Sequence, residues 1–382
     1  MAVEMTESYE IGPIRPPSEA YSLFVRVTRN CPWNRCKFCH IYKNFKFQLR
    51  SVEEVKRDID AAKKCYDAIE AKAKEMGLGD KIREAAGMLL GSGSGEAFNN
   101  VALWLYAGGE NVFLQDANSL IMPTDQLVEI LDYLKSTFPC IKRITSYARA
   151  HTAARKTVEE LRRLHEAGLS RLHIGLESGC DPVLQFMDKG ITAADQIKGG
   201  KNVVASGISL SEYVLLGVGG KKMWREHALE TARVLNEINP DYIRIRTLTV
   251  NNQMPLYDEI QKGNFIRSND EDLAREERLL IEKLNCSSNF VSDHTTNLFQ
   301  ELNGKMPGDK DKFLAIIDRF LALSPDEKHR FELGRRMGIY SRLNDIEDAG
   351  KRQTVEQYAD QVINQGPEVV ERVIWELMER FI

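Results

Sequence analysis

Three cysteines stand close together in the segment Cys31-Pro-Trp-Asn-Arg-Cys36-Lys-Phe-Cys39, separated by four and then two residues. Thiolates so near one another can converge on one metal centre, and thiolates select zinc, copper or iron–sulfur clusters. The segment follows the β-rich run 22–28, and parallel α/β folds place active sites at the carboxyl ends of their strands. It is therefore the first candidate for chemistry in this chain.

Three kinds of site leave something unexplained. A structural zinc site needs four ligands, and His40, next to Cys39, would have to complete the set. A plant-type ferredoxin centre has this spacing and a distant fourth cysteine; Cys65 lies at a plausible distance, but in an amphipathic stretch where a packed thiol is expected. A redox dithiol of Cys36 and Cys39 leaves Cys31 without a role.

The fourth kind of site is a cubane iron–sulfur cluster held by three cysteines. Such a cluster normally takes four thiolates. With three, one iron keeps an open position, as the metal of a catalytic zinc site does, and that iron can bind a substrate or cofactor directly. An electron-transfer or metal-binding protein on the same scaffold remains the nonenzymatic alternative.

The elements that must position this segment alternate between strands and helices. Runs rich in β-formers lie at 22–28, 112–114, 141–146, 171–176, 210–216 and 242–248, and helical patterns lie between them, as at 124–138, 158–167, 193–206 and 225–239. Such alternation is typical of βαβ units and a parallel sheet. We therefore predict the α/β class, as a partial, TIM-like (β/α)6 barrel.

The chain divides into an N-terminal arm (1–21), the barrel (22–250) and a C-terminal loop and helical region (251–382). Within the barrel, apolar residues at steps of three and four over 51–77 predict one helix with a buried face. The remainder of 51–108 predicts a second, Gly-punctuated helical segment. We interpret 51–108 as an insertion that covers the barrel and takes no part in catalysis.

Composition excludes several classes of protein. The 382 residues are 43 % hydrophobic and 28 % charged, which is ordinary for a globular chain and excludes a disordered or fibrous one. A net charge of −4 makes nucleic acid an unexpected partner. No apolar run reaches the length of a membrane span and the start lacks signal-peptide features, so we expect no membrane partner and a cytoplasmic location. Seven cysteines are too few for a disulfide scaffold.

The cysteine loop after the first strand of a six-unit βα series, with Phe38 directly before the last cysteine, resembles that of the radical S-adenosylmethionine (radical SAM) superfamily. That family's commonest first gap is three residues instead of four. The resemblance implies a 4Fe-4S cluster on Cys31, Cys36 and Cys39. Its open iron would bind S-adenosylmethionine, which an electron from the cluster cleaves to give a 5′-deoxyadenosyl radical that abstracts hydrogen from an unidentified substrate. It further implies an external one-electron donor, flavodoxin-like or ferredoxin-like, because no second cysteine cluster is visible.

The family usually has a Gly-Gly-Glu-like motif after its second strand, where it holds the methionyl amino group. The Gly-Gly-Glu sequence at 108–110 precedes the strand at 112–114, so we discount it. The equivalent position contains Asp116, Asn118 and Ser119, which are candidate contacts of S-adenosylmethionine. Turn chemistry before a helix is the alternative explanation for these three residues.

Four further residues are candidate cofactor contacts. Arg149, after the third long strand, can face a carboxylate or ribose, or form an ion pair at the barrel rim. Glu177 is costly to bury without a partner and stands in a Glu-Ser-Gly sequence that looks like a motif of the coproporphyrinogen-oxidase-like and methylthiotransferase-like branches. Lys189 resembles the family's basic residue near the methionyl carboxylate. Gly217 allows close backbone approach, and the resemblance places it and Phe38 near adenine.

Two other features are ambiguous. The dispersed Cys140, Cys180 and Cys286 are expected to be packed thiols. The polar stretch 286–297 is either a loop that folds over the barrel mouth or a capped surface loop.

Overall fold

The computed structural model describes residues 8–92 and 95–380. The first seven residues of the expected arm, residues 93–94 of the expected insertion and the last two residues of the C-terminal region lie outside the described residues. The chain folds as two compact units. Among the described residues, the first comprises 8–34, 41–92, 95–174 and 202–210, and the second comprises 35–40, 175–201 and 211–380.

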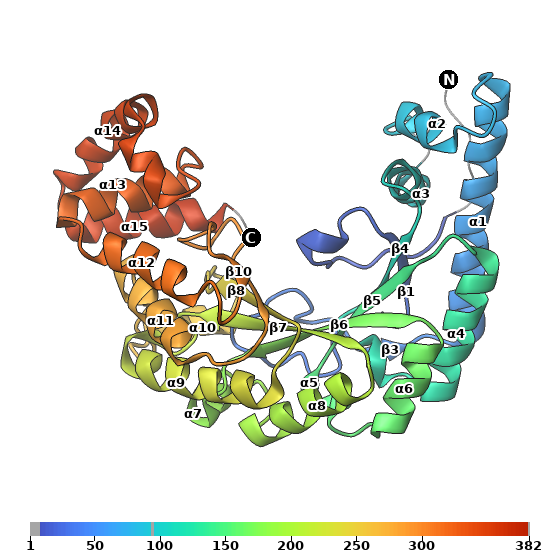
Figure 1. The fold of residues 1–382 in the computed structure, drawn as a ribbon, viewed down its shortest axis with the longest axis horizontal. Helices are drawn as coiled ribbons and strands as arrows, with labels where there is room; N and C mark the ends of the chain where they lie inside the picture. The colour runs from blue at the N-terminus through green and yellow to red at the C-terminus, as the bar shows by residue number, and fades with distance from the viewer. Residues whose placement is uncertain (1–7, 93–94, 381–382) are drawn as a thin grey trace. The chain divides into compact units, whose positions relative to one another are not determined.

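The strands confirm the predicted α/β class (Figure 1). They are hydrogen-bonded in the order β1 (Leu23–Arg26), β4 (Asn111–Gln115), β5 (Arg143–Ala148), β6 (Leu169–Glu177), β7 (Ser209–Leu216), β8 (Tyr242–Thr247), β9 (Asn289–Val291) and β10 (Asn303–Lys305). The pairs from β1 to β6 and from β7 to β9 are parallel, whereas β10 runs antiparallel to β9. The short strands β2 (Thr28–Arg29) and β3 (Gln48–Leu49) form a separate antiparallel pair. All six predicted strands are present.

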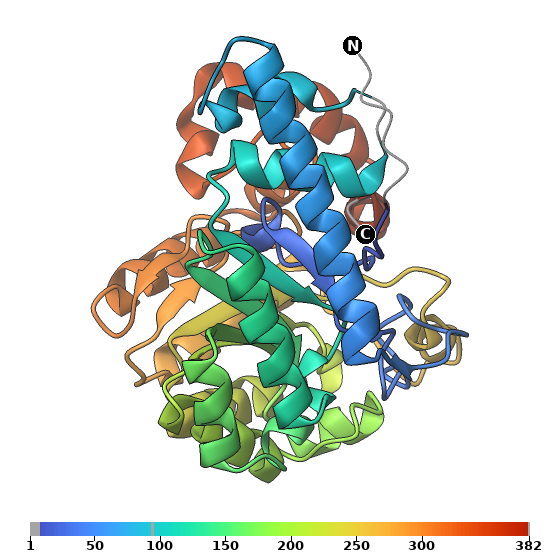
Figure 2. The same cartoon turned by 90° about the vertical axis from the view of Figure 1, so that its right-hand side faces the viewer.

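In the first unit, the long helix α1 connects the strand pair β1 and β4. The helices of this unit are η1 (Pro17–Glu19), α1 (Val52–Glu75), α2 (Ile82–Leu89), α3 (Glu96–Tyr106), η2 (Ser119–Ile121), α4 (Thr124–Thr137), α5 (Ala150–Ala153) and α6 (Val158–Glu166). A reciprocal capping box of Ser51 and Glu54 begins α1, which satisfies two of the amide groups that a helix start leaves unpaired. The helix packs on α4 and β1, and Figure 2 shows it running beside α4.

The segment after α1 differs from the prediction. It forms two helices, α2 and α3, instead of one, and both pack on α1. Gly91 and Gly95, with φ angles of 74° and 91°, separate them, because this backbone region is readily open only to glycine. The helix α1 is therefore the crossover between two neighbouring strands, and α2 and α3 are the additional elements.

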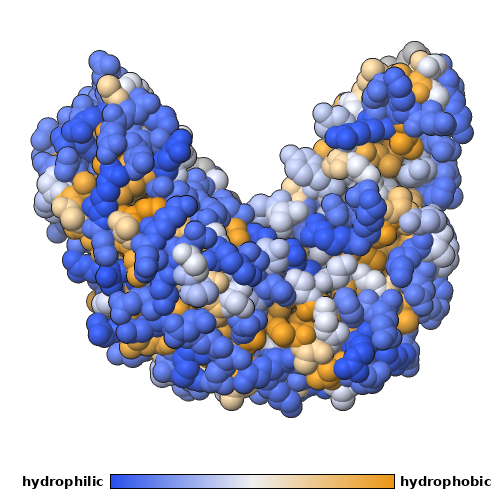
Figure 3. Space-filling model, viewed as in Figure 1, coloured by the Kyte–Doolittle hydropathy of each residue, from blue (hydrophilic) through white to orange (hydrophobic). Residues whose placement is uncertain are grey.

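In the second unit, helices follow β6, β7, β8 and β10, and those after β10 form a helical C-terminal region. They are α7 (Asp181–Phe186), α8 (Ala193–Ala205), which extends into the first unit, α9 (Gly220–Ile238), α10 (Pro255–Gln261), α11 (Asp270–Lys283), α12 (Lys310–Leu321), α13 (Pro325–Arg336), η3 (Leu343–Glu347), α14 (Ala349–Ile363) and α15 (Pro367–Glu379). The helix α11 packs on α9 and α12, and α13 packs on α14 and α15. The visible surface over α13 and α14 is mostly hydrophilic (Figure 3). The helical tail expected from the sequence is thus present.

The polar stretch 286–297 contributes to the sheet, which the sequence did not indicate. Part of it forms β9, parallel to β8. The buried Asn297 donates from its amide to the carbonyl of Ile245 (2.9 Å) and accepts from the hydroxyl of Thr247 (3.1 Å). These bonds fix the segment to β8. Among the described residues, no helix has both the length and the apolar character that crossing a bilayer requires.

Candidate functional site

The first half of the cysteine segment belongs to the first unit and forms a closed turn. The Cys31 Sγ accepts a hydrogen bond from the backbone N–H of Asn34 (3.4 Å). The side chain of Asn34 donates to the carbonyl of Tyr42, and the Lys43 ammonium donates to the carbonyl of Asn34 (2.9 Å). Asn30 and Asn34 both have positive φ angles, 68° and 50°, in a region that asparagine tolerates better than most residues. The turn that presents Cys31 is therefore held from both sides.

The second half, residues 35–40, belongs to the second unit. The backbone N–H of Cys39 donates to the carbonyl of Cys36 (3.3 Å). Between them, Lys37 donates from its N–H to the carbonyl of Met187 and accepts from the N–H of Leu256, both at 2.9 Å. The segment is thus tied by its backbone to the end of α7 and the start of α10.

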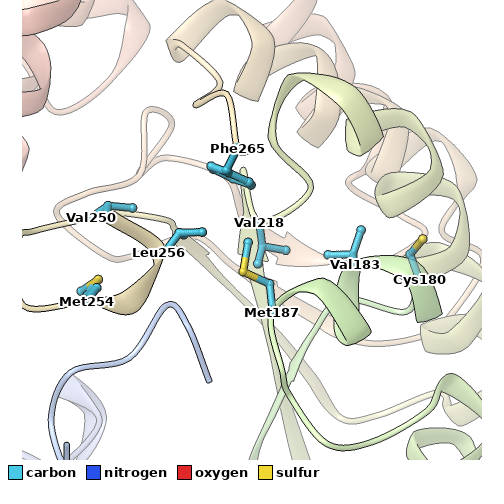
Figure 4. Close-up of a cluster of buried hydrophobic side chains, with 8 residues drawn as sticks. All are labelled: Cys180, Val183, Met187, Val218, Val250, Met254, Leu256 and Phe265. Atoms are coloured by element: carbon cyan, nitrogen blue, oxygen red, sulfur yellow. The ribbon is translucent and has the colours of Figure 1, made fainter. Parts of the chain in front are cut away.

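An apolar cluster supports this half of the segment (Figure 4). Its buried members are Cys180, Val183, Met187, Val218, Val250, Met254, Leu256 and Phe265, and Phe38 packs against them. Figure 4 shows Met187 and Val218 side by side at its centre. Cys180, expected to be a packed thiol, is confirmed as one.

The remaining thiols differ in exposure. Cys65 and Cys286 are buried, as expected, whereas Cys140 is exposed and the expectation of a packed thiol there is wrong. Its position just before β5, between α4 and the strand, leaves it at the surface. Cys31, Cys36 and Cys39 are half-buried and form no disulfide within the described residues.

The donor chemistry of the cysteine segment fits an iron–sulfur cluster. Three partly accessible thiols outside any disulfide are the ligands that such a cluster takes. Within residues 8–92 and 95–380, no three His, Cys, Asp or Glu side chains are placed together as ligands of one metal ion. The case for a cluster therefore rests on the type of the ligands and on the groups around the segment.

Three predicted cofactor contacts lie together in the second unit. The Lys189 Nζ is 3.0 Å from Glu177 Oε1 and 5.6 Å from the centre of the Phe38 ring. Glu177 ends β6 with a φ of 62°. Gly175 leaves room for the pair, because a Cβ there would lie 2.2 Å from Glu177 Oε1. A cation, a carboxylate and an aromatic ring thus meet next to Cys39.

Asp116 is bound within the first unit. Its side chain is completely buried, and Oδ2 lies 2.6 Å from Arg26 Nη2 and accepts from the backbone N–H of Asn30 (3.2 Å). The hydroxyl of Tyr42 donates to Oδ1. Burial and the nearby Asp116 carboxylate raise the pKa of Tyr42, so the hydroxyl keeps its proton. Asp116 therefore anchors the entrance to the Cys31 turn.

Asn118, Ser119 and Arg149 also lie in the first unit. Asn118 accepts from the backbone N–H of Arg149 (3.0 Å) and donates to the hydroxyl of Thr152 (2.9 Å), and the Ser119 hydroxyl donates to a β4 carbonyl. The bonds of Asn118 run to the segment after β5, and its side chain does not cap the short helix that follows it, so they differ from the local turn bonds of the alternative explanation. The Arg149 guanidinium lies 5.2 Å from the centre of the Trp33 ring, which places it against the cysteine segment. Cofactor contact by these three residues stays a prediction.

Gly217 lies at the end of β7 with a φ of 82°. Its N–H donates to the buried carboxylate of Glu276 (2.8 Å). A Cβ at this position would lie 2.9 Å from Leu273, so glycine is required here both by conformation and by space. Gly217 and Leu248 also line one cavity.

Glu212, on β7, is a candidate site residue that sequence reasoning missed. Its side chain is 1 % exposed, and within the described chain its Oε2 has no hydrogen-bond partner. Burial raises its pKa to about 8, with the Lys189 charge lowering it and the Glu177 charge raising it. The carboxyl of Glu212 is thus mainly protonated at neutral pH, and it interacts electrostatically with Lys189 and Glu177. The argument applied to Glu177, a lone carboxyl in an apolar strand, would also have identified Glu212.

Two arginines on β8 form a second group that was missed. Arg244 and Arg246 share the carboxylate of Asp293 at 3.4 and 3.3 Å. The Arg246 guanidinium lies 4.9 Å from the centre of the Tyr213 ring. Burial and the Arg246 charge lower the pKa of His294 to about 4, so this imidazole is neutral. Alternating arginines in a predicted strand were the available sequence signal.

No family model matches the sequence, and no curated protein matches it. Solved structures do match at low identity. The cobalamin-dependent S-adenosylmethionine radical enzyme OxsB is 14 % identical with a TM-score of 0.45, covering 94 % of this chain and 54 % of that one. The radical S-adenosylmethionine methyltransferase TsrM of Kitasatospora setae is 14 % identical with a TM-score of 0.43, and the match covers 67 % of this chain and 40 % of that one. SuiB of Streptococcus suis, bound to S-adenosylmethionine, is 12 % identical with a TM-score of 0.41, and the match covers 72 % of this chain and 51 % of that one.

The chain thus spans about half the length, or less, of these three proteins. By name, two of them are radical SAM enzymes and the third is bound to S-adenosylmethionine.

The first prediction concerns Asp116. Asp116→Asn is expected to lower the free energy of unfolding by about 2 kcal/mol, because it removes the buried carboxylate from Arg26 and leaves that guanidinium only its ion pair with the partly exposed Glu10. Urea denaturation monitored by circular dichroism measures the change. The control is Asp125→Asn, whose carboxylate is 83 % exposed and pairs with Arg163; its loss should stay below about 1 kcal/mol. Equal losses in the two variants would contradict the anchoring role.

The second prediction concerns Glu212 and pH. Its pKa rises from an ordinary 4.5 to about 8 on folding, so the folded chain binds the proton more tightly and stability falls as pH rises between these values. The contribution is at most about 1.4 kcal/mol per pH unit. Glu212→Gln removes it, so the variant should lose less stability than the wild type between about pH 5.5 and pH 7.5. If the unfolding free energies of the wild type and of Glu212→Gln changed equally with pH, the raised pKa of Glu212 would be contradicted.

Proposed function

We propose that this chain is a radical SAM enzyme in which Cys31, Cys36 and Cys39 hold a 4Fe-4S cluster and S-adenosylmethionine binds the remaining iron. The observation that carries this proposal is the meeting of Phe38, Lys189 and Glu177 beside the cysteine segment. The sequence resemblance assigns the same three residues to that cofactor, independently of their proximity. A packing role alone would not require a cation and a carboxylate at this position.

The side chains have chemically distinct tasks. The Lys189 ammonium can pair with the methionyl carboxylate, since charge-assisted hydrogen bonds are the stronger kind. The Glu177 carboxylate can accept from a ribose hydroxyl or the methionyl amine. The Phe38 ring offers an apolar face for adenine. When bound, the cluster and S-adenosylmethionine supply reductive C–S cleavage and hydrogen abstraction from the substrate.

The protein would also control access and ligand geometry. Thiols bind metal as thiolates, and metal binding commonly organises its own ligands, so we expect the three sulfurs to converge when the cluster forms. Asp116 holds the turn of Cys31 through the N–H of Asn30, and the backbone bonds of Lys37 hold the other half. The apolar cluster of Figure 4 excludes water from one side of residues 35–40.

Arg149 is the next candidate for the cofactor, through its position over Trp33. Asn118, Ser119 and Gly217 would contact the cofactor while keeping their hydrogen bonds within the protein. The electron is expected from an external flavodoxin-like or ferredoxin-like donor. The substrate is unidentified, and the alternative remains an iron–sulfur electron carrier or metal-binding protein without SAM chemistry.

The third prediction tests the cluster. Full-length protein reconstituted anaerobically is expected to hold about four irons and to release 5′-deoxyadenosine from S-adenosylmethionine under dithionite. Cys31→Ala, Cys36→Ala and Cys39→Ala should each lose the cluster and the nucleoside. Cys65→Ala is the matched control, because that thiol is buried in α1. Iron and sulfide analysis, visible absorption and chromatography of the nucleoside provide the readouts.

Other results would favour the alternative. About two irons with a ferredoxin-like spectrum and no nucleoside would indicate an electron carrier. Loss of the cluster in Cys65→Ala would indicate a fourth protein ligand and remove the open iron.

The fourth prediction concerns Lys189. In the reconstituted protein, Lys189→Met should raise the dissociation constant for S-adenosylmethionine at least about tenfold, because a charge-assisted bond worth roughly 1.5–3 kcal/mol is lost. The iron content should stay at the wild-type value. Anaerobic titration calorimetry measures the affinity, and Lys198→Met, an exposed lysine of α8, should bind as the wild type does. Unchanged affinity in Lys189→Met would remove this residue from the cofactor site.

A further inference from the structure

The second unit contains a cavity at the carboxyl ends of two strands. It measures about 860 Å³ with its open mouth. Gly217 follows β7 and Leu248 to Val250 follow β8, and the remaining walls come from the start of α11 and from α13 and α15. The helices α13 and α15 pack on each other (Figure 1). Barrel enzymes bind substrates at the carboxyl ends of their strands.

The cavity wall contains a cation, Arg267, whose pKa burial lowers and the charge of Glu379 raises, although no described residue forms an ion pair with it. Arg267 makes no hydrogen bond or ion pair with any described residue, and its Nε is inaccessible to solvent. Its guanidinium lies 4.9 Å from the centre of the Trp375 ring. The neighbouring Ser268 Oγ is likewise buried and unbonded among described residues. Buried polar groups normally have partners, so two adjacent exceptions in a cavity wall point to a missing ligand.

The carboxylates in the wall, by contrast, already have partners. Asp270 is ion-paired with Arg336. Glu271 lies 3.2 Å from Lys328, and Glu371 accepts a hydrogen bond of 2.9 Å from Asn269. The pairs with Arg336 and Lys328 neutralise two of these negative charges, and the hydrogen bond satisfies the third carboxylate.

Two other titratable side chains in the wall are uncharged. Burial and the nearby Asp270 raise the pKa of Glu332 well above its usual value, so it is protonated. Burial lowers the pKa of His329, which keeps its ring neutral near pH 7. Glu371 keeps its charge and its hydrogen bond from Asn269. Of the charged side chains in the wall, Arg267 is the one that the described residues leave without a direct hydrogen bond, and it is the group offered to an anionic ligand.

The rest of the wall is apolar. Trp375, Ile374 and Met378 of α15 line it, together with Leu248 and Leu273. Aromatic and aliphatic groups of this kind bind the body of an organic ligand, while a few polar groups fix its orientation. A free inorganic anion would leave this apolar surface uncovered.

We propose that this cavity binds an organic anion, with its carboxylate, sulfonate or phosphate on Arg267 and Ser268 and its apolar or aromatic body against Trp375 and Ile374. Resting on the proposed function, the enzyme's substrate is then of this class, because the cavity opens at the strand ends. Binding itself requires neither the cluster nor S-adenosylmethionine.

The fifth prediction tests this site with 8-anilinonaphthalene-1-sulfonate, an aromatic anion. The full-length protein, with and without its cluster, is expected to bind about one molecule of the dye. Arg267→Gln should weaken this binding at least about tenfold. It should leave binding of the uncharged analogue N-phenyl-1-naphthylamine within about twofold, since only the charge is removed. Fluorescence titration measures both affinities, and Trp375→Phe should reduce energy transfer from tryptophan to the dye.

Two control variants separate binding from folding. Arg233→Gln removes an exposed arginine on α9 and should bind both dyes as the wild type does. Arg267→Lys retains a positive charge and should recover part of the lost affinity. An unchanged dye affinity in Arg267→Gln, equal losses for both dyes, or no stoichiometric binding by the wild type would overturn the proposal. Because each readout is independent of nucleoside release, failure here leaves the radical SAM proposal standing.

Discussion

The turn that carries Cys31 depends on the buried carboxylate of Asp116. A desolvated charge is tolerated only with a counter-charge and hydrogen bonds, and this carboxylate has Arg26, the N–H of Asn30 and the hydroxyl of Tyr42. Arg26 ends β1, Asn30 directly precedes Cys31, and Asp116 directly follows β4. One charge therefore fixes the cysteine turn to the ends of two neighbouring strands.

Buried polar side chains that have hydrogen-bond partners within the protein stabilise the fold, whereas those without such partners are candidate ligand contacts. Asp116 and Asn118 use their side chains internally, which explains their burial without a cofactor. In the described chain, Arg267 makes no such bond, and Glu212 has an unpaired oxygen. Lys189 lies between these extremes, because its ion pair with Glu177 is partly exposed and a carboxylate ligand can share it.

Sequence periodicity predicted the sheet well. All six expected strands exist, and the apolar stripe of 51–77 forms the buried face of α1. The strand β9 was missed because it has only three residues in a polar stretch, so neither alternation nor length could indicate it. Gly91 and Gly95 were visible as breaks, but their left-handed backbone, which divides the segment into two helices, is a property of the folded chain.

The site was only partly predictable, for a different reason. Residue type shows what Asp116, Asn118 and Ser119 can bond to, but only the fold shows which partners they use. Glu177 and Lys189 were chosen from a family resemblance, and their separation of 3.0 Å is an independent finding. Glu212 carried the same signal as Glu177 and was passed over because it lies in mid-strand, away from the carboxyl end where function was sought.

The formal charge of the chain gives a misleading impression of the interior of the second unit. Counting side chains gives −4, with every carboxyl counted as negative. Yet burial raises the pKa of Glu212 and Glu277 there to about 8, so these two are mainly neutral at pH 7. Burial also raises the pKa of Glu332 well above its usual value. The guanidinium groups of Arg244 and Arg246 share one carboxylate, and that of Arg267 has no direct ion pair among the described residues. These arginines and Lys189 thus offer positive charge within a chain of negative net charge, which suits both a methionyl carboxylate and an organic anion.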